Sequence, residues 1–84
     1  MQYHVGIKFK DDISERKNIS ELEEKAQQWQ ATKSGKIQLN YLDEEHLAAY
    51  DWASTFENKM QSLYFLNHCI KQSYITGVFI EKEE

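Results

Sequence analysis

The most constraining feature of this sequence is the stretch of residues 43–72, which has the periodicity of one long amphipathic helix. At about 100° per residue, its main apolar stripe holds Ala49, Trp52, Ala53, Phe56, Met60, Leu63 and Ile70. Phe65 falls roughly opposite that stripe, while Tyr64 and His68 fall on one flank with Tyr50. A helix that is apolar on most sides must be covered on most sides. We therefore expect a second chain, or another part of this chain, to cover its C-terminal half.

Three further segments alternate between apolar and polar residues, as strands do. Residues 2–10 have the cleanest alternation, residues 36–42 form a second strand, and residues 74–80 form a third. The third strand is apolar on both faces, which predicts a central position or a face covered by a partner. Residues 11–18 break the alternation and are predicted to be a loop. Ser20 and Glu23 have capping-box spacing, so a helix is expected to begin there and to end at Ser34-Gly35.

The order strand, helix, strand, helix, strand predicts a single domain over residues 1–84. Its fold class would be α+β, or small α/β, in the form of a two-layer sandwich with a three-stranded sheet and both helices on one face. The helical connections are long enough for parallel pairing, and an antiparallel edge is equally open. The second sheet face would be mostly polar, and it would carry Gln2, His4, Gly6, Lys8, Lys10, Gln38, Asn40, Ile75 and Phe79.

The residue types that usually catalyse reactions or bind metals are few in this sequence, and they are scattered along it. The three histidines and one cysteine have none of the spacings that hold a metal on one helix or loop, and no glycine-rich phosphate loop is present. His46 is expected to be solvated, and Cys69 to be a small packing residue. We therefore predict no catalytic residues, no metal site and no cofactor, and a protein that is not an enzyme.

Composition predicts where in the cell the protein is found and which partners are disfavoured. A single cysteine, the lack of a signal-like N-terminus and the lack of an apolar run of about 20 residues favour a cytoplasmic protein. The formal net charge of -4 argues against a general phosphate-binding surface.

The acidic residues suggest a contact surface for a basic partner. Glu44 and Asp51 are seven residues apart and would share a line on the long helix, with Glu45 beside them, while Glu21 and Glu24 face outward on the first helix. Such runs are most often ordinary solvated surface. In the functional interpretation they attract a basic protein, including one whose basic site normally holds nucleic acid, so that this chain would modulate or inhibit it as a DNA mimic does.

Self-association is the second functional expectation. Tyr64, Phe65 and His68 form the aromatic side of the predicted helix, and Phe79 lies on the uncovered sheet face, so these four residues are the predicted interface of a homodimer. The alternative is that the helix breaks near Asn67, or that residues 11–18 fold over Phe65.

Two other function classes remain open from the sequence. Phe79 with Lys8 and Lys10 would allow single-stranded nucleic acid to bind on the open sheet face, although one aromatic residue is few for this purpose. A small-molecule enzyme is the other class, and no motif supports it.

Overall fold

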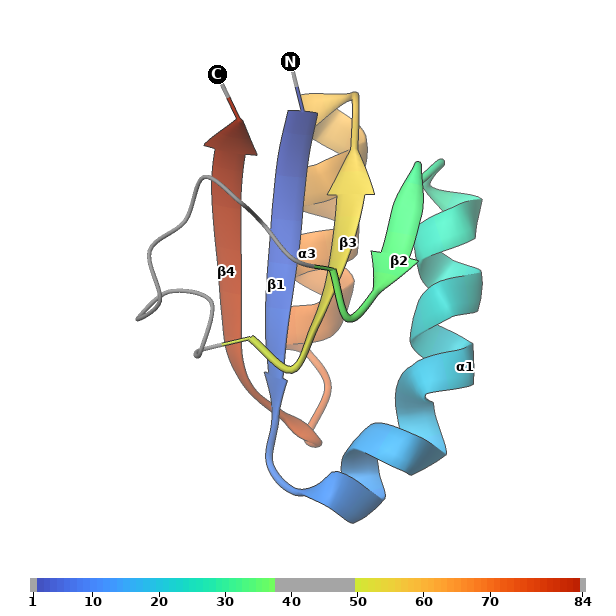
Figure 1. Ribbon diagram of the computed structural model, residues 1–84, viewed down its shortest axis with the longest axis vertical. Helices are drawn as coiled ribbons and strands as arrows, with labels where there is room; N and C mark the ends of the chain where they lie inside the picture. The colour runs from blue at the N-terminus through green and yellow to red at the C-terminus, as the bar shows by residue number, and fades with distance from the viewer. Residues whose placement is uncertain (1, 38–49, 84) are drawn as a thin grey trace.

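A computed structural model describes residues 2–37 and 50–83, and it shows a two-layer α+β arrangement (Figure 1). In chain order, the described elements are β1 Gln2–Phe9, α1 Asp12–Gln28, β2 Lys33–Gly35, β3 Trp52–Phe56, α3 Lys59–Ile70 and β4 Ile75–Glu83. Buried side chains of α1 and α3 pack in one cluster with those of β1 and β3. Both helices therefore cover the same face of the sheet.

The sheet of the described residues has four strands in the order β2-β3-β1-β4, and every neighbouring pair is antiparallel. Ile7 in the central strand β1 lies opposite Trp52 of β3 and Val78 of β4. The order of the described elements is that of the split β-α-β, or ferredoxin-like, topology. The two-layer α+β prediction is confirmed, but the described sheet has four strands rather than the three predicted. The sequence left parallel and antiparallel pairing open, and the described strands pair antiparallel.

The long helix predicted over residues 43–72 is wrong at its centre. Trp52–Phe56 is a strand buried along its whole length, and α3 begins only at Lys59. Asn58 caps that helix, and its side-chain oxygen accepts a hydrogen bond from the Gln61 N–H at 3.1 Å. A short strand buried on both faces lacks the period of two, so its apolar residues also fit a helical stripe. Residues 43–49 of the predicted helix lie outside the described residues.

The loop predicted over residues 11–18 is also wrong, because α1 begins at Asp12. Asp11 is the N-cap, and its carboxylate accepts a hydrogen bond from the Ser14 N–H at 2.7 Å. A cluster of polar residues indicates a loop only where no cap precedes it. α1 ends at Gln28, and Gln30 just after it has a φ of 63°. The helix therefore does not extend to the predicted end at Ser34-Gly35, because Gly35 lies in β2.

The first and third predicted strands are confirmed as β1 and β4. In the described sheet, however, β1 is central and β4 is an edge strand, so the central position predicted for the third strand is wrong there. A register shift between Lys8 and Phe9 places Ile75 opposite Phe9, and Ile75 packs against the core rather than on the open face. Of the predicted strand 36–42, residues 38–42 lie outside the described residues.

The core is one cluster between the sheet and the two helices. Its buried apolar members are Val5, Ile7, Phe9, Leu22, Ala26, Trp52, Phe56, Phe65 and Cys69. Burial of Trp52 and Phe56 confirms two of the predicted core residues, whereas Trp29 and Leu63 are only partly buried.

Phe65 lies at the centre of this core, which corrects the expectation that it could not reach it. Its ring centroid is 5.5 Å from that of Phe56, 6.1 Å from that of Trp52 and 6.3 Å from that of Trp29. The predicted stripe runs through residues 50–56, which are not helical, so its phase does not apply to α3. The buried stripe of α3 instead consists of Ser62, Phe65 and Cys69.

Candidate functional site

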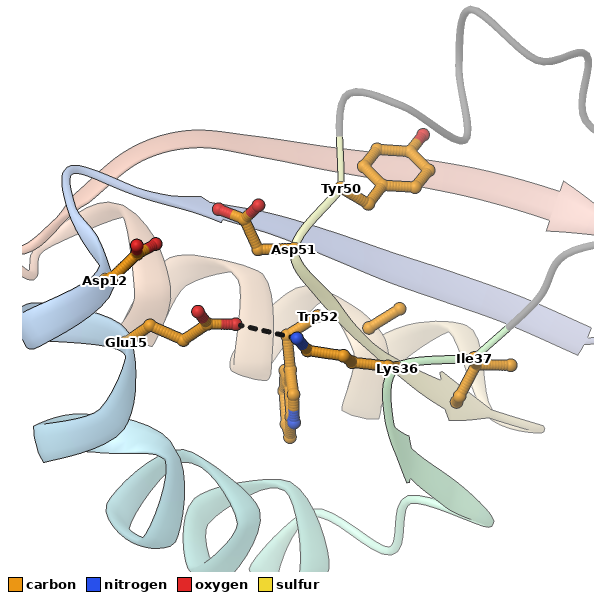
Figure 2. Close-up of a pocket in the computed structure, with 8 residues that line it drawn as sticks. Asp12, Glu15, Lys36, Ile37, Tyr50, Asp51 and Trp52 are labelled. Carbon is orange, nitrogen blue, oxygen red and sulfur yellow. Dashed lines mark ion pairs between the residues drawn. The ribbon is translucent and has the colours of Figure 1, made fainter.

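A pocket of about 450 Å³ opens where the first turn of α1, the residues after β2 and the start of β3 meet (Figure 2). Among the described residues, its walls contain three carboxylates, one lysine and two aromatic side chains. The residues that line it are Asp12, Glu15, Lys36, Ile37, Tyr50, Asp51, Trp52 and Ala53. We call it the acidic pocket and treat it as the candidate site.

Asp12 and Glu15 reach the pocket because of the way in which α1 begins. The Ser14 backbone N–H bound to the Asp11 carboxylate holds the pKa of that carboxyl below its usual range. Asp12 and Glu15 follow in the first helical turn, where the exposed N–H groups and the helix dipole favour negative charge. The start of the helix thus stabilises two of the carboxylates that line the pocket.

Asp51 reaches the pocket through backbone pairing. Its N–H donates to the Ile7 carbonyl at 2.8 Å, its Oδ2 accepts from the Phe9 N–H at 2.9 Å, and its Oδ1 lies 3.9 Å from Lys8 Nζ. Asp51 therefore extends the contact between β1 and β3, and it is not on a helix. The predicted helical line through Glu44 and Asp51 is wrong in this respect, and Glu44 and Glu45 lie outside the described residues.

Glu15 and Lys36 form the charged pair at the centre of the pocket. Glu15 Oε1 lies 3.9 Å from Lys36 Nζ, and the Glu15 side chain is 15% exposed whereas that of Lys36 is 77% exposed (Figure 2). Glu15 Oε1 is buried and has no hydrogen-bond partner among the residues that the structure describes. An ion pair to such an exposed lysine is weak. The buried oxygen therefore retains its capacity to accept a hydrogen bond from a cationic group.

Tyr50 joins the pocket to the sheet face opposite α1 and α3. Its ring lies across Gly6, where a Cβ atom would come within 2.5 Å of Tyr50 Cδ1. It also lies 5.1 Å from the Phe79 ring, and its hydroxyl donates to Glu81 Oε1 at 3.5 Å. Burial and the neighbouring Glu81 carboxylate raise the pKa of Tyr50 to about 12.

The sheet face predicted to be open is partly closed around β1. His4 is buried, with Nδ1 2.8 Å from Thr55 Oγ1 and Nε2 3.3 Å from Glu83 Oε2. Gly6 is buried as well. The expectation of an exposed His4 and Gly6 is therefore wrong, whereas Phe79 and Lys8 remain exposed.

Unfolding at alkaline pH provides one prediction. Burial raises the pKa of Tyr50, Tyr74 and Cys69 to about 12, from ordinary values of 10.0, 10.0 and 9.0. The folded protein therefore keeps protons that the unfolded chain releases, so their contribution to stability is complete below about pH 9 and is lost as the pH rises toward 12. We expect the urea midpoint to fall steadily above about pH 9. Tyr50→Phe should make this fall shallower, and a midpoint that stays constant to about pH 11 would contradict the burial of these groups.

The residues predicted for a homodimer interface lie on different sides of the molecule. Phe65 is in the core, and Phe79 is on the sheet face opposite the helices. Tyr64 and His68 line a second cleft of about 450 Å³ with Trp29, Asn67 and Lys71. Burial, with the nearby Lys25, lowers the pKa of His68. The structure thus does not bring the four predicted residues into one patch.

The thiol of Cys69 is a core group. It is buried, and burial raises its pKa to about 12, so the thiolate form is disfavoured at neutral pH. Within residues 2–37 and 50–83, no group of three or more histidine, cysteine, aspartate or glutamate residues is arranged to hold a metal ion. None of the helices in these ranges is long and apolar enough to cross a membrane.

Among the predicted acidic contacts that the structure describes, which are Glu21, Glu24 and Asp51, only Asp51 lines the acidic pocket. Glu21 and Glu24 are exposed farther along α1. Sequence reasoning missed Asp12 and Glu15 because residues 11–18 were interpreted as a loop. The useful signal was Asp11 followed by two acidic residues within four positions, which is typical of a capped helix start.

Comparisons with models of known protein families, with curated proteins and with solved structures found no match.

Proposed function

We propose that this protein is a non-enzymatic interaction module that binds a basic protein and modulates or inhibits it, with the acidic pocket receiving a lysine or arginine side chain. The observation that carries the proposal is the pair of Glu15 and Lys36. The chain's own lysine reaches across the pocket toward a buried carboxylate oxygen without completing a hydrogen bond. A partner's cation placed closer to Glu15 would replace it.

The pocket suits a cationic side chain on two further grounds. Asp12 and Asp51 add negative charge from separate segments of the chain, and the ring of Tyr50 offers a surface on which a guanidinium group stacks. Its volume of about 450 Å³ exceeds what one such side chain needs, so the flanking residues of a basic segment would enter with it.

The wider surface fits the same class of partner. Glu21 and Glu24 are exposed on the helix that supplies Glu15, and the formal net charge of -4 favours association with a basic protein. We propose that the partner's basic surface also binds nucleic acid, so that this chain competes for it as a DNA mimic does. Glu44 and Glu45 stay part of this proposal as additional contacts.

The test measures binding of a fluorescently labelled oligo-arginine peptide by anisotropy at low ionic strength. We expect Lys36→Met to tighten binding about threefold or more, because it removes the ammonium group that competes for Glu15, and Glu15→Gln to weaken binding by a similar factor. Raising the salt concentration should weaken all of these complexes.

Matched controls separate the pocket from overall charge. Lys33→Met changes the net charge as Lys36→Met does, and Lys33 is exposed on β2 away from the pocket. Glu24→Gln is the corresponding control for Glu15→Gln. If each pocket variant behaves like its control, the acidic pocket is not the contact, and if the wild-type protein does not bind the peptide at all, the basic-partner proposal fails.

One observation favours the second candidate, binding of single-stranded nucleic acid to the sheet face. Tyr50 joins Phe79 there, which makes two neighbouring aromatic rings where the sequence indicated one. Bases stack on such rings, but the Glu81 and Glu83 carboxylates lie on the same face and repel phosphates. A labelled oligonucleotide that binds at low salt, and is released by Phe79→Ala, would favour this function over the basic partner.

A further inference from the structure

The two edges of the described sheet differ in how they are protected. Edge strands in soluble proteins are usually short, charged, or interrupted by proline, which prevents pairing with another chain. β2 is three residues long and begins with Lys33. β4 is nine residues long, and its first six residues, Ile-Thr-Gly-Val-Phe-Ile, contain neither a charge nor a proline. The edge at β4 therefore lacks the protection that the edge at β2 has.

The direction of the outer backbone groups on β4 follows from contacts at β1. The Ile7 carbonyl and the Phe9 N–H both point toward Asp51 at the β3 side, so the even-numbered residues of β1 point toward β4. These residues lie opposite Gly77, Phe79 and Glu81. In an antiparallel pair, opposed residues either exchange both hydrogen bonds or neither. The N–H and C=O groups of Val78, Ile80 and Lys82 consequently point away from β1.

Two apolar side chains accompany these outer backbone groups. Phe79 is 39% exposed and Ile80 is 38% exposed, and they lie on opposite faces of the sheet. Among the described residues, β4 pairs with β1 alone. A strand that offers both backbone groups and apolar side chains has what a second strand needs in order to add to the sheet.

We propose that β4 pairs antiparallel with β4 of a second copy of this chain, about a two-fold axis at Phe79, so that the two sheets become one. Phe79 then faces Phe79 of the second copy as a non-hydrogen-bonded pair. Val78 faces Ile80 of the second copy and exchanges backbone hydrogen bonds with it. A two-fold contact of this kind closes on itself, as most homodimers do.

Charge disfavours a register shifted toward the charged end of β4. With the axis at Phe79, Glu81 faces Gly77, Glu83 faces Ile75, and Lys82 faces Thr76. An axis at Glu81 would place that carboxylate against its own copy, and like charges directly opposite each other are destabilising. The inference deepens the self-association part of the functional hypothesis and does not depend on a basic partner, so its test uses this protein alone.

The first experiment is light scattering on a sizing column over a series of micromolar concentrations. We expect the wild-type protein to approach twice the chain mass of 10.0 kDa. Ile80→Lys should run as a monomer, because it places a charge within the apolar contact. Ile13→Lys is the matched control, since Ile13 is an exposed apolar residue on α1, and it should remain dimeric. A monomeric wild-type protein, or a dimer that Ile80→Lys leaves intact, would overturn the proposal.

Two further measurements locate the interface, and neither requires that Ile80→Lys folds normally. On dilution, the amides of Val78 and Ile80 should lose protection from hydrogen exchange, while those of Phe79 and Glu81 stay protected by β1. Phe79→Cys should form a disulfide-linked dimer under mild oxidation, because non-hydrogen-bonded pairs bring two Cα atoms to about 4.5 Å and the native Cys69 is buried. Glu81→Cys should not crosslink. Concentration-dependent protection centred on Tyr64 and His68 would overturn the proposed strand pairing.

Discussion

Phe65→Ala is expected to destabilise the protein by about 3–5 kcal/mol, which is the usual cost of removing a buried phenylalanine. Phe65 is fully buried and contacts the rings of Trp29, Trp52 and Phe56. A chain of 84 residues has a total stability of roughly 4–12 kcal/mol, so the variant would lose at least about a quarter of that stability. Urea denaturation followed by far-ultraviolet circular dichroism measures the change.

The neighbouring residue supplies a matched control for this prediction. Tyr64 is 47% exposed, so Tyr64→Ala should cost less than about 1 kcal/mol. Leu63, which the sequence pattern placed on the core-facing stripe, is only partly buried, so Leu63→Ala should cost less than Phe65→Ala. If Leu63→Ala cost more stability than Phe65→Ala, the side of the helix predicted from the sequence to face the core would be correct. That result would contradict the observed packing of α3.

Gly6→Ala is expected to destabilise the protein by roughly 1–3 kcal/mol, as overpacking usually does. A Cβ atom at this position would lie 2.5 Å from Tyr50 Cδ1 and 2.6 Å from Tyr50 Cε1, so the ring must move. Displacement of the ring would also break its contact with Phe79 and its hydrogen bond to Glu81. Thermal or urea unfolding of the variant measures this cost.

A double-mutant cycle identifies the cause of that cost. In the Tyr50→Ala background, the ring that blocks the Cβ atom is gone, so Gly6→Ala should be nearly neutral. Gly77→Ala is the control on the adjacent strand, where the nearest atom to a Cβ would be Phe79 Cε2 at 3.2 Å, and a smaller cost is expected. An equal cost for Gly6→Ala with and without Tyr50 would show that the glycine serves another purpose.

The candidate site was only partly predictable from the sequence. Asp51 was identified as a contact residue, but its neighbours in the pocket, Asp12 and Glu15, were assigned to a loop. Lys36 directly follows β2, and it is 21 residues along the chain from Glu15 and 15 residues before Asp51. No local pattern links these three positions, because their proximity depends on how α1 and the two strands pack.

The misassignment of residues 52–56 has a physical explanation. Trp52, Ser54 and Phe56 point toward the helices, while Ala53 and Thr55 point to the other face, and all five are buried. Burial on both faces removes the alternation that identifies a strand. Trp52 and Phe56 are also four residues apart, a spacing that a helical stripe and one face of a strand share. The sequence pattern therefore did not distinguish the two structures.

The sequence by itself determined the α+β class, the strands β1 and β4, and the acidic character of the surface, because these follow from local alternation and from charge. The tertiary structure alone decided that residues 52–56 form a strand, that Phe65 rather than Leu63 enters the core, and that Asp12, Glu15 and Asp51 share a pocket. Each of these outcomes depends on contacts between segments far apart in the chain. Such contacts provide the burial that overrides local periodicity when a short apolar segment fits either a helix or a strand.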